Sequence, residues 1–404
     1  MMIPRTRPDL GALEILSALC PGATRREFEE EVAIRAGAQY GLAFAYAHAG
    51  FFALLRALNL TQAEVILPAY TCKIMPEVVM ATGNIPVFAD IDLADYNMDL
   101  GALKSAITTK TRVIVATHMF GYPINVDAIR EITNNGHIVI VEDAALMFPD
   151  SVHDLGGLRG DVGLFSFGPG KPLFTIRGGV MITSDATLHE RLRSYRDEQM
   201  GCLPSRECIK RWILLMAHYL LSRKLVYGAT QPLGLSRNAL HVLASRLRLS
   251  RKGGRSSTAL IPNDFSTRYT DFQARLGLVQ LRKAGSIRSW RQTLARLYGE
   301  ALHGVSGLTP APVVDGASYS LYPIRVENRD AIDFIQKMRA KGIETGRVFN
   351  ALSNLIRFRP YARDFYPCAE QAGREAVSLP AHTDLTEKQT RYIAESIRQV
   401  LANT

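Results

Sequence analysis

Short apolar segments alternate with helical stretches along the first half of the chain. Four of these segments are rich in Val and Ile and apolar on both faces, at residues 64–68, 85–90, 112–118 and 137–143. Such segments predict strands of a parallel sheet that is buried on both faces. Helical stretches such as 51–58 and 126–132 separate them, and residues 178–183 predict a returning strand. The succession predicts an α/β layered domain.

The alternation breaks between residues 201 and 260. A run of ten apolar residues, 212–221, has basic residues on both sides. Ten residues are too few to cross a bilayer, which takes about 20. The run predicts a helix in the core or at an interface. A helix that lies on a membrane surface is the alternative, and the basic flanks support it.

The last third of the chain is helical and then mixed. Apolar positions at helical spacing predict helices over 272–302, 330–342 and 386–401, and residues 319–326 predict a strand. We therefore expect three regions: a large α/β domain at 1–200, a basic, partly apolar helical insertion at 201–262, and a small C-terminal α+β domain at 263–404.

The excess positive charge of the chain lies in the insertion. Residues 201–260 hold eleven Lys or Arg and one acidic residue, which equals the whole formal net charge of +10. No nucleic-acid-binding motif accompanies this charge, so we expect no nucleic-acid partner. Peripheral contact of the segment with an anionic membrane surface stays open.

The five cysteines are scattered and form neither a CxxC pair nor a metal-ligand spacing. This usage predicts reduced thiols and no metal site. The hydrophobic share of 47% is typical of a soluble globular protein. The first residues lack the apolar stretch of a signal peptide. Together these features predict a cytoplasmic protein.

The candidate chemistry centres on Lys171, in the Gly- and Pro-containing segment 165–171. Asp143 ends a predicted strand, and Ser166 lies five residues before the lysine. These groups suit pyridoxal phosphate (PLP): the amine can form a Schiff base with the aldehyde, the carboxylate can pair with the ring nitrogen, and the hydroxyl can hold the phosphate. The alternatives are a solvated surface lysine and an aspartate that caps a helix. Ligands of α/β sheets bind beyond the carboxyl ends of strands, which favours the PLP interpretation.

Further motifs resemble one family. The matching segments, in order, are 27–31, 68–71, 86–92, 117–121, 142–145, 165–167, 178–179, 273–274, 280–281 and 378–382. With Lys171 they make the chain similar to the PLP-dependent sugar aminotransferases of the DegT/DnrJ/EryC1/StrS family. The resemblance implies the type I fold of PLP-dependent transferases: a large α/β domain with a mainly parallel sheet, and a smaller α+β C-terminal domain.

The resemblance also implies roles for single residues. Lys171 would carry the Schiff base, Asp143 would pair with the pyridine nitrogen, and Ser166 would bind the phosphate. Gly50, near a helix start, would place backbone amides near the phosphate. Because members of the family are homodimers with active sites at the subunit interface, Ser266 would approach the cofactor of the partner subunit.

The chain departs from the family pattern at several cofactor-binding positions. Ala49-Gly50-Phe51 stands in place of Ser-Gly-Thr, and Cys72 in place of a stacking aromatic. Leu146 replaces a Gln or His, Pro172 replaces an Asn, Arg177 replaces an acidic residue, and Ser266 replaces an Asn. Arg177 or His48 could supply the phosphate partner, and Tyr46 or Phe51 could replace the stacking ring. The alternative for His48 is a structural role in the core or a loop, and the alternative for Phe51 is a place in the helix core. For His118 we expect a structural role.

These features predict an aminotransferase. An amino donor, for which we expect glutamate, would leave its amine on the cofactor, and a nucleotide-linked keto-sugar would accept it, in surface polysaccharide or secondary-metabolite biosynthesis. Lys171 argues against the deoxygenating branch, where a histidine takes the lysine position. The alternative is a PLP-fold protein that has lost catalysis and acts as a scaffold, with association with a membrane surface left open.

Overall fold

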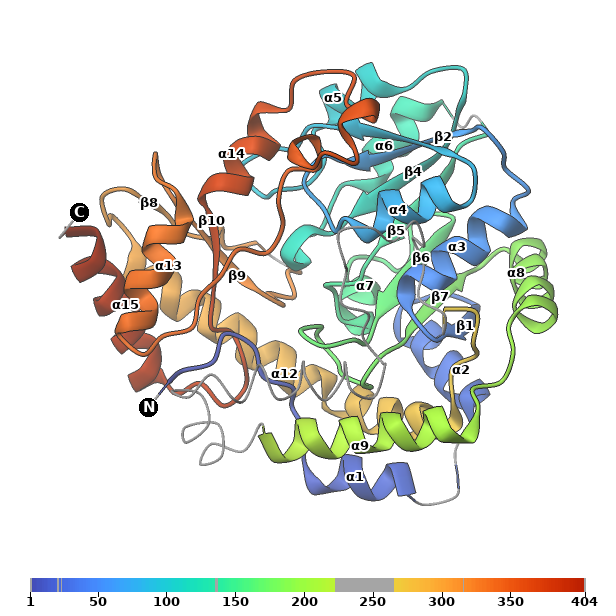
Figure 1. Ribbon diagram of the computed structural model, residues 1–404, viewed down its shortest axis with the longest axis horizontal. Helices are drawn as coiled ribbons and strands as arrows, with labels where there is room; N and C mark the ends of the chain where they lie inside the picture. The colour runs from blue at the N-terminus through green and yellow to red at the C-terminus, as the bar shows by residue number, and fades with distance from the viewer. Residues whose placement is uncertain are drawn as a thin grey trace.

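A seven-stranded sheet forms the centre of the larger part of the molecule (Figure 1). The computed structural model describes residues 2–19, 22, 24–134, 137–221, 265–314 and 316–402. Its strands are β1 (Tyr40–Phe44), β2 (Glu64–Pro68), β3 (Ile85–Ala89), β4 (Thr111–Thr117), β5 (Val139–Asp143), β6 (Val162–Ser166) and β7 (Gly179–Thr183), in the spatial order β1-β7-β6-β5-β4-β2-β3. The four predicted parallel strands are confirmed as β2 to β5.

The returning strand is also confirmed, because β7 runs antiparallel to both β6 and β1. The sequence pattern did not predict β1 or β6. Each contains a glycine, Gly41 or Gly163, and an interior glycine weakens the apolar signal of a strand. Both glycines are needed by packing: a Cβ at Gly41 would lie 2.3 Å from the carbonyl oxygen of Glu29, and one at Gly163 would lie 2.8 Å from Ile182 Cγ1.

Both faces of the sheet are buried, as the apolar segments predict. Along β4, Val113 and Val115 belong to one apolar cluster, while Ile114 and Ala116 belong to another. The helices that surround the sheet are α2 (Arg25–Arg35), α3 (Ala47–Ala57), α4 (Ile74–Ala81), α5 (Leu100–Ala106), α6 (Val126–Thr133), α7 (Pro149–Asp154) and α8 (Ala186–Gln199). The larger part is thus an α/β layered domain.

The smaller part carries an antiparallel sheet of order β10-β9-β8. Its elements are β8 (Leu308–Thr309), β9 (Tyr322–Val326), α13 (Ala331–Ala340), α14 (Pro367–Glu375), β10 (Ala376–Leu379) and α15 (Glu387–Ala402). The long helix α12 (Asp271–Leu302) packs on α2 and on α1 (Ala12–Leu19), and also on α15, so it joins the two parts. The proposed three-region division stays a prediction. Contacts cross this division: Ile3 forms a β-bridge with Ile343, and Tyr70 forms one with Ala351.

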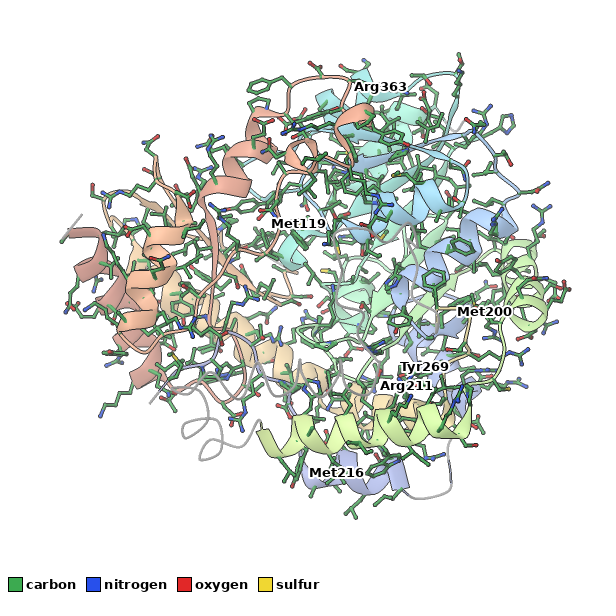
Figure 2. All side chains as sticks on the ribbon, viewed as in Figure 1. Met119, Met200, Arg211, Met216, Tyr269 and Arg363 are labelled. Atoms are coloured by element: carbon green, nitrogen blue, oxygen red, sulfur yellow. The ribbon has the colours of Figure 1, made fainter. Side chains whose placement is uncertain are left out.

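The described portion of the insertion is helix α9 (Ser205–Leu221), beside α1 in Figure 1. Leu214 and Leu215 are buried in a cluster with Phe272 of α12. The guanidinium of Arg211 is fully buried and donates a 2.7 Å hydrogen bond to Gln273 Oε1, near Tyr269 (Figure 2). These contacts agree with the prediction of a helix in the core or at an interface. The rest of the insertion, 222–262, lies outside the described residues. No helix in the described part of the chain is long and apolar enough to cross a membrane.

Candidate active site

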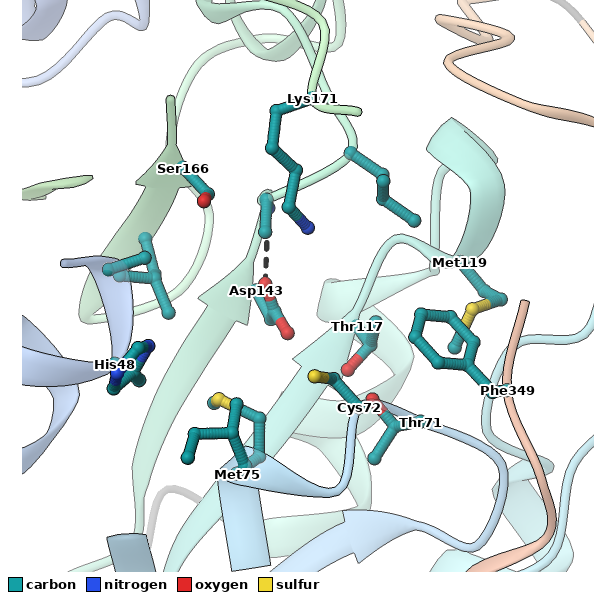
Figure 3. Close-up of a pocket in the computed structure, with 15 residues that line it drawn as sticks. His48, Thr71, Cys72, Met75, Thr117, Met119, Asp143, Ser166, Lys171 and Phe349 are labelled. Carbon is teal, nitrogen blue, oxygen red and sulfur yellow. Dashed lines mark hydrogen bonds between the residues drawn. The ribbon is translucent and has the colours of Figure 1, made fainter. Parts of the chain in front are cut away.

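A pocket opens at the carboxyl ends of β4, β5 and β6 (Figure 3). Strand ends contribute Thr117, Asp143 and Ser166, the loop that follows β6 contributes Lys171, and Phe349 enters from the C-terminal part of the chain. The other lining residues are Ala47, His48, Thr71, Cys72, Ile74, Met75, Met119, Ala145, Leu146 and Leu164. The structure thus brings the three groups of the sequence-based PLP hypothesis into one pocket.

Asp143 is a buried carboxylate near the lysine amine. Its side chain accepts a 3.1 Å hydrogen bond from the backbone N–H of Ala145, and its own carbonyl accepts one from His118 N–H. Burial raises the pKa of Asp143, and the positive charge of Lys171 acts in the opposite direction. A cation bound beside the carboxylate would favour its ionised form in the same way.

Backbone geometry and hydrogen bonds fix the loop that presents Lys171. Gly170 has a φ of +78°, which favours glycine, and Lys171 N–H donates to Gly168 O. Gln273 of α12 anchors the far end of the loop, because its side-chain amide donates to the carbonyl oxygens of Thr175 and Arg177 at 3.1 and 2.8 Å. The motif at 273–274 therefore acts by holding the lysine loop, a role that its sequence alone did not reveal.

The N-terminal end of α3 faces the pocket through Ala47 and His48. Helix N-termini favour anions because their first backbone N–H groups point outward with the positive end of the helix dipole. Ser166 also lines the pocket, on the same side as His48 (Figure 3). The helix end and the serine hydroxyl together form a site that suits a phosphate.

Gly50 does not line this pocket. Its backbone N–H already donates to Tyr46 O at 3.2 Å, and it packs against β7, where a Cβ would lie 2.6 Å from Met181 Cγ. The role that the resemblance implies for Gly50 at the phosphate stays a prediction; the residues of α3 that line the pocket are Ala47 and His48, at its start. Gly50 instead allows α3 to approach the sheet closely.

Phe51 also lies away from the pocket. Its ring is fully buried in the main apolar cluster, which favours the helix-core alternative over the stacking role. Cys72 does line the pocket, and burial raises the pKa of its thiol, which favours the protonated form. Ser266 is exposed, and its carbonyl accepts a hydrogen bond from Gly201 N–H. It does not line the pocket of its own chain, and its approach to a partner subunit stays a prediction.

Three residues near α3 were candidates for replacing lost cofactor contacts. The guanidinium of Arg177 hydrogen-bonds the Tyr46 hydroxyl and lies over the Tyr46 ring. The His48 ring lies 4.9 Å from the Tyr46 ring, between centroids, and lines the pocket. Of the three, only His48 contributes to the pocket wall, so the roles of Arg177 and Tyr46 are indirect in this arrangement.

His118 has the structural role that we expected. It is buried, its Nε2 lies 3.1 Å from Glu142 Oε2, and its Nδ1 accepts a hydrogen bond from Ile124 N–H. Glu142 in turn accepts hydrogen bonds from the backbone of Arg159 and Gly160. These bonds fix the ends of β4 and β5, on which Thr117 and Asp143 stand. Thr117 itself was missed as a pocket residue, because a threonine that ends a strand carries no chemical signal in the sequence.

Comparison with known proteins identifies the family. The model of the DegT/DnrJ/EryC1/StrS aminotransferase family matches residues 12–210 and 242–398. The chain belongs to this family. It is therefore an aminotransferase, and its architecture is that of the type I PLP-dependent transferases.

Relatives of this aminotransferase are similar along nearly its whole length. A UDP-N-acetyl-3-dehydro-α-D-glucosamine 3-aminotransferase of Acidithiobacillus ferrooxidans is 26% identical, over 94% of this chain and 89% of the relative. A Helicobacter pylori aminotransferase involved in pseudoaminic acid biosynthesis has a TM-score of 0.76 at 20% identity, with complete coverage of both chains. A putative sugar aminotransferase of Streptococcus pneumoniae, solved in its PMP form, has a TM-score of 0.75 at 22% identity and covers 99% of each chain.

Proposed function

We propose that this aminotransferase uses PLP to transfer an amino group, from glutamate, to the keto group of a nucleotide-linked sugar. The observation that carries the proposal is the single pocket in which Lys171 faces the buried Asp143 beside Ser166 and the N-terminal end of α3. Named relatives that act on nucleotide sugars, and structural neighbours in PLP and PMP forms, support the cofactor and the substrate class.

The residues of the pocket fit the chemical groups of PLP. Bound PLP supplies an aldehyde that condenses with amines and a ring that withdraws electrons from the reacting carbon. The Asp143 carboxylate would hold the ring nitrogen in its protonated form, which offsets the cost of burying that carboxylate. Ser166 Oγ and the amides that begin α3 would hold the phosphate.

Lys171 has two tasks in this proposal. Its Nζ would hold the cofactor through the aldehyde, and its amine would take up and return the proton that moves during transfer. Met119 and Phe349 form an apolar wall on the side of Asp143 opposite to Ser166 (Figure 3). This wall would exclude water from the reacting groups.

The assembly and the cellular setting are finer parts of the proposal. We infer a homodimer in which Ser266 approaches the cofactor of the partner subunit, and a role in surface polysaccharide or secondary-metabolite sugar biosynthesis in the cytoplasm. Membrane contact through 201–260 stays a prediction, because most of that segment lies outside the described residues. The retained lysine and aspartate disfavour the scaffold alternative.

The test is the visible absorption spectrum of the purified protein with PLP, recorded before and after addition of glutamate. We expect a cofactor band that glutamate bleaches, and borohydride reduction should attach the cofactor to the peptide that contains Lys171. The Lys171→Ala variant should fold but lose both the attachment and the turnover. Lys73→Ala, which removes an exposed lysine next to Cys72, is the matched control and should keep both. Attachment at another lysine, or half-transamination by Lys171→Ala, would refute the assignment.

A further inference from the structure

Thr117 lines the pocket with a buried hydroxyl that none of the described residues hydrogen-bonds. Its side chain is only 5% exposed, and its Oγ1 makes no hydrogen bond to any other described residue. Buried hydroxyl groups are nearly always hydrogen-bonded, because one left without a partner lowers stability. The hydroxyl also lines the pocket rather than the closed core. Its partner is therefore to be sought in a ligand.

The position of Thr117 in the sheet decides which ligand edge it meets. Thr117 pairs with Asp143 in the parallel ladder between β4 and β5, and neighbouring strands lie about 4.8 Å apart. The spatial order is β6-β5-β4, so Ser166 of β6 and Thr117 of β4 lie on opposite sides of Asp143. Figure 3 shows this arrangement, with Ser166 and His48 on one side and Thr117 on the other.

The chemistry of the PLP ring then identifies the partner. On the pyridine ring, the phosphate-bearing carbon and the carbon that carries the 3-oxygen flank the aldehyde carbon on opposite sides. With the ring nitrogen at Asp143 and the phosphate at Ser166 and α3, the edge with the 3-oxygen faces β4. We propose that Thr117 Oγ1 donates a hydrogen bond to the 3-oxygen of the cofactor, an inference that rests on the proposed use of PLP.

The other residues on this side of the pocket are poorer donors. Leu146, Met119 and Phe349 have no polar hydrogen to offer. The Cys72 thiol donates only weakly. Thr71 follows β2, which lies one strand farther from Asp143 than β4 does. Thr117 is thus the hydroxyl nearest to Asp143 on the side where the 3-oxygen lies.

Two substitutions separate the hydroxyl from the shape of the side chain. Thr117→Val keeps the shape and removes the donor, while Thr117→Ser keeps the donor. Thr345→Val is the matched control, because Thr345 is equally buried (6% exposed), also has an Oγ1 without a partner among the described residues, and lies outside the pocket. Each protein is prepared without cofactor, checked for folding by thermal unfolding, and titrated with PLP while the visible band is recorded.

We expect Thr117→Val to raise the dissociation constant of PLP about 10-fold, the value of one hydrogen bond of ordinary strength. The pH midpoint of the visible band should also move upward by about 0.5 to 1 pH unit, since the donor stabilises the deprotonated oxygen. Thr117→Ser should stay within about 3-fold of the parent in PLP affinity, and Thr345→Val should not change either quantity. The apoprotein of Thr117→Val should unfold at the same or a higher temperature, because it loses an unpaired polar group.

An unchanged affinity and an unchanged pH midpoint in Thr117→Val would overturn the inference while leaving the proposed function intact. Equal changes in Thr117→Val and Thr345→Val would overturn it as well, since they would indicate a general effect of losing a buried hydroxyl. A parent protein that shows no PLP band would instead refute the proposed function itself. The two failures are therefore distinguishable in one experiment.

Discussion

Gly179 sets the distance between β7 and the end of α3 that faces the pocket. A Cβ at this position would lie 2.3 Å from Ala47 Cα and 2.6 Å from Ala47 N. Ordinary carbon–carbon contact begins at about 3.5 Å, so Gly179→Ala forces a separation of roughly 1.2 Å. The obstructing atoms are backbone, which cannot rotate away. Overpacking of this kind costs about 1–3 kcal/mol of stability.

The same displacement would move the helix end that is proposed to hold the phosphate. We therefore expect Gly179→Ala to destabilise the apoprotein by about 1–3 kcal/mol and to weaken PLP binding as well. Gly50→Ala is the matched comparison on the same helix. Its new Cβ would lie 2.6 Å from Met181 Cγ and 3.1 Å from Phe44 Cδ2. These are side-chain atoms, which can move more readily than backbone, and alanine gains about 1 kcal/mol over glycine in a helix. Its net effect on stability should stay within about 1 kcal/mol.

The assay is denaturant unfolding of the two apoproteins and the parent at one pH, followed by PLP titration of each. We expect the midpoint of Gly179→Ala to fall clearly below that of Gly50→Ala, and only Gly179→Ala to lose PLP affinity. Equal stability and equal affinity in the two variants would refute the reasoning. A loss of affinity confined to Gly50→Ala would restore the role that the family resemblance implied for Gly50.

Two further substitutions follow from the site. Burial raises the pKa of Asp143, so the wild-type apoprotein should lose stability as the pH rises from the pKa of the unfolded chain, about 4, through the higher pKa of the folded state. Asp143→Asn should remove this loss and be more stable than wild type at neutral pH. The same variant should bind PLP about 10-fold or more weakly. Unfolding curves at several pH values check the stability, and PLP titration checks the affinity. An Asp143→Asn apoprotein that is less stable than wild type at neutral pH would contradict the stability argument. Phe51→Leu should lower the free energy of unfolding by about 1 kcal/mol through core packing alone, and the PLP dissociation constant should not change. A weaker PLP affinity in a folded variant would place Phe51 at the site after all.

Local patterns account for what the sequence predicted of the fold. Residues apolar on both faces identified β2 to β5, since burial on both sides of a parallel sheet leaves no polar positions. The glycine-containing strands β1 and β6 were missed because their close packing against Glu29 and Ile182 is not visible in the sequence. Lys171 and Asp143 were predicted because their chemistry is distinctive in its local context.

The sequence by itself determined the class of the protein: an α/β chain with a lysine, an aspartate and a serine suited to PLP. The tertiary structure alone decided which neighbours complete the pocket. A helix rises 1.5 Å per residue, so only Ala47 and His48 at the start of α3 reach the pocket. Gly50 and Phe51 lie about one turn farther along the axis and pack against Met181 and the core. Likewise, only strand order places Thr117 beside Asp143 and opposite Ser166. Contacts between residues far apart in the chain depend on packing, which local sequence patterns do not encode.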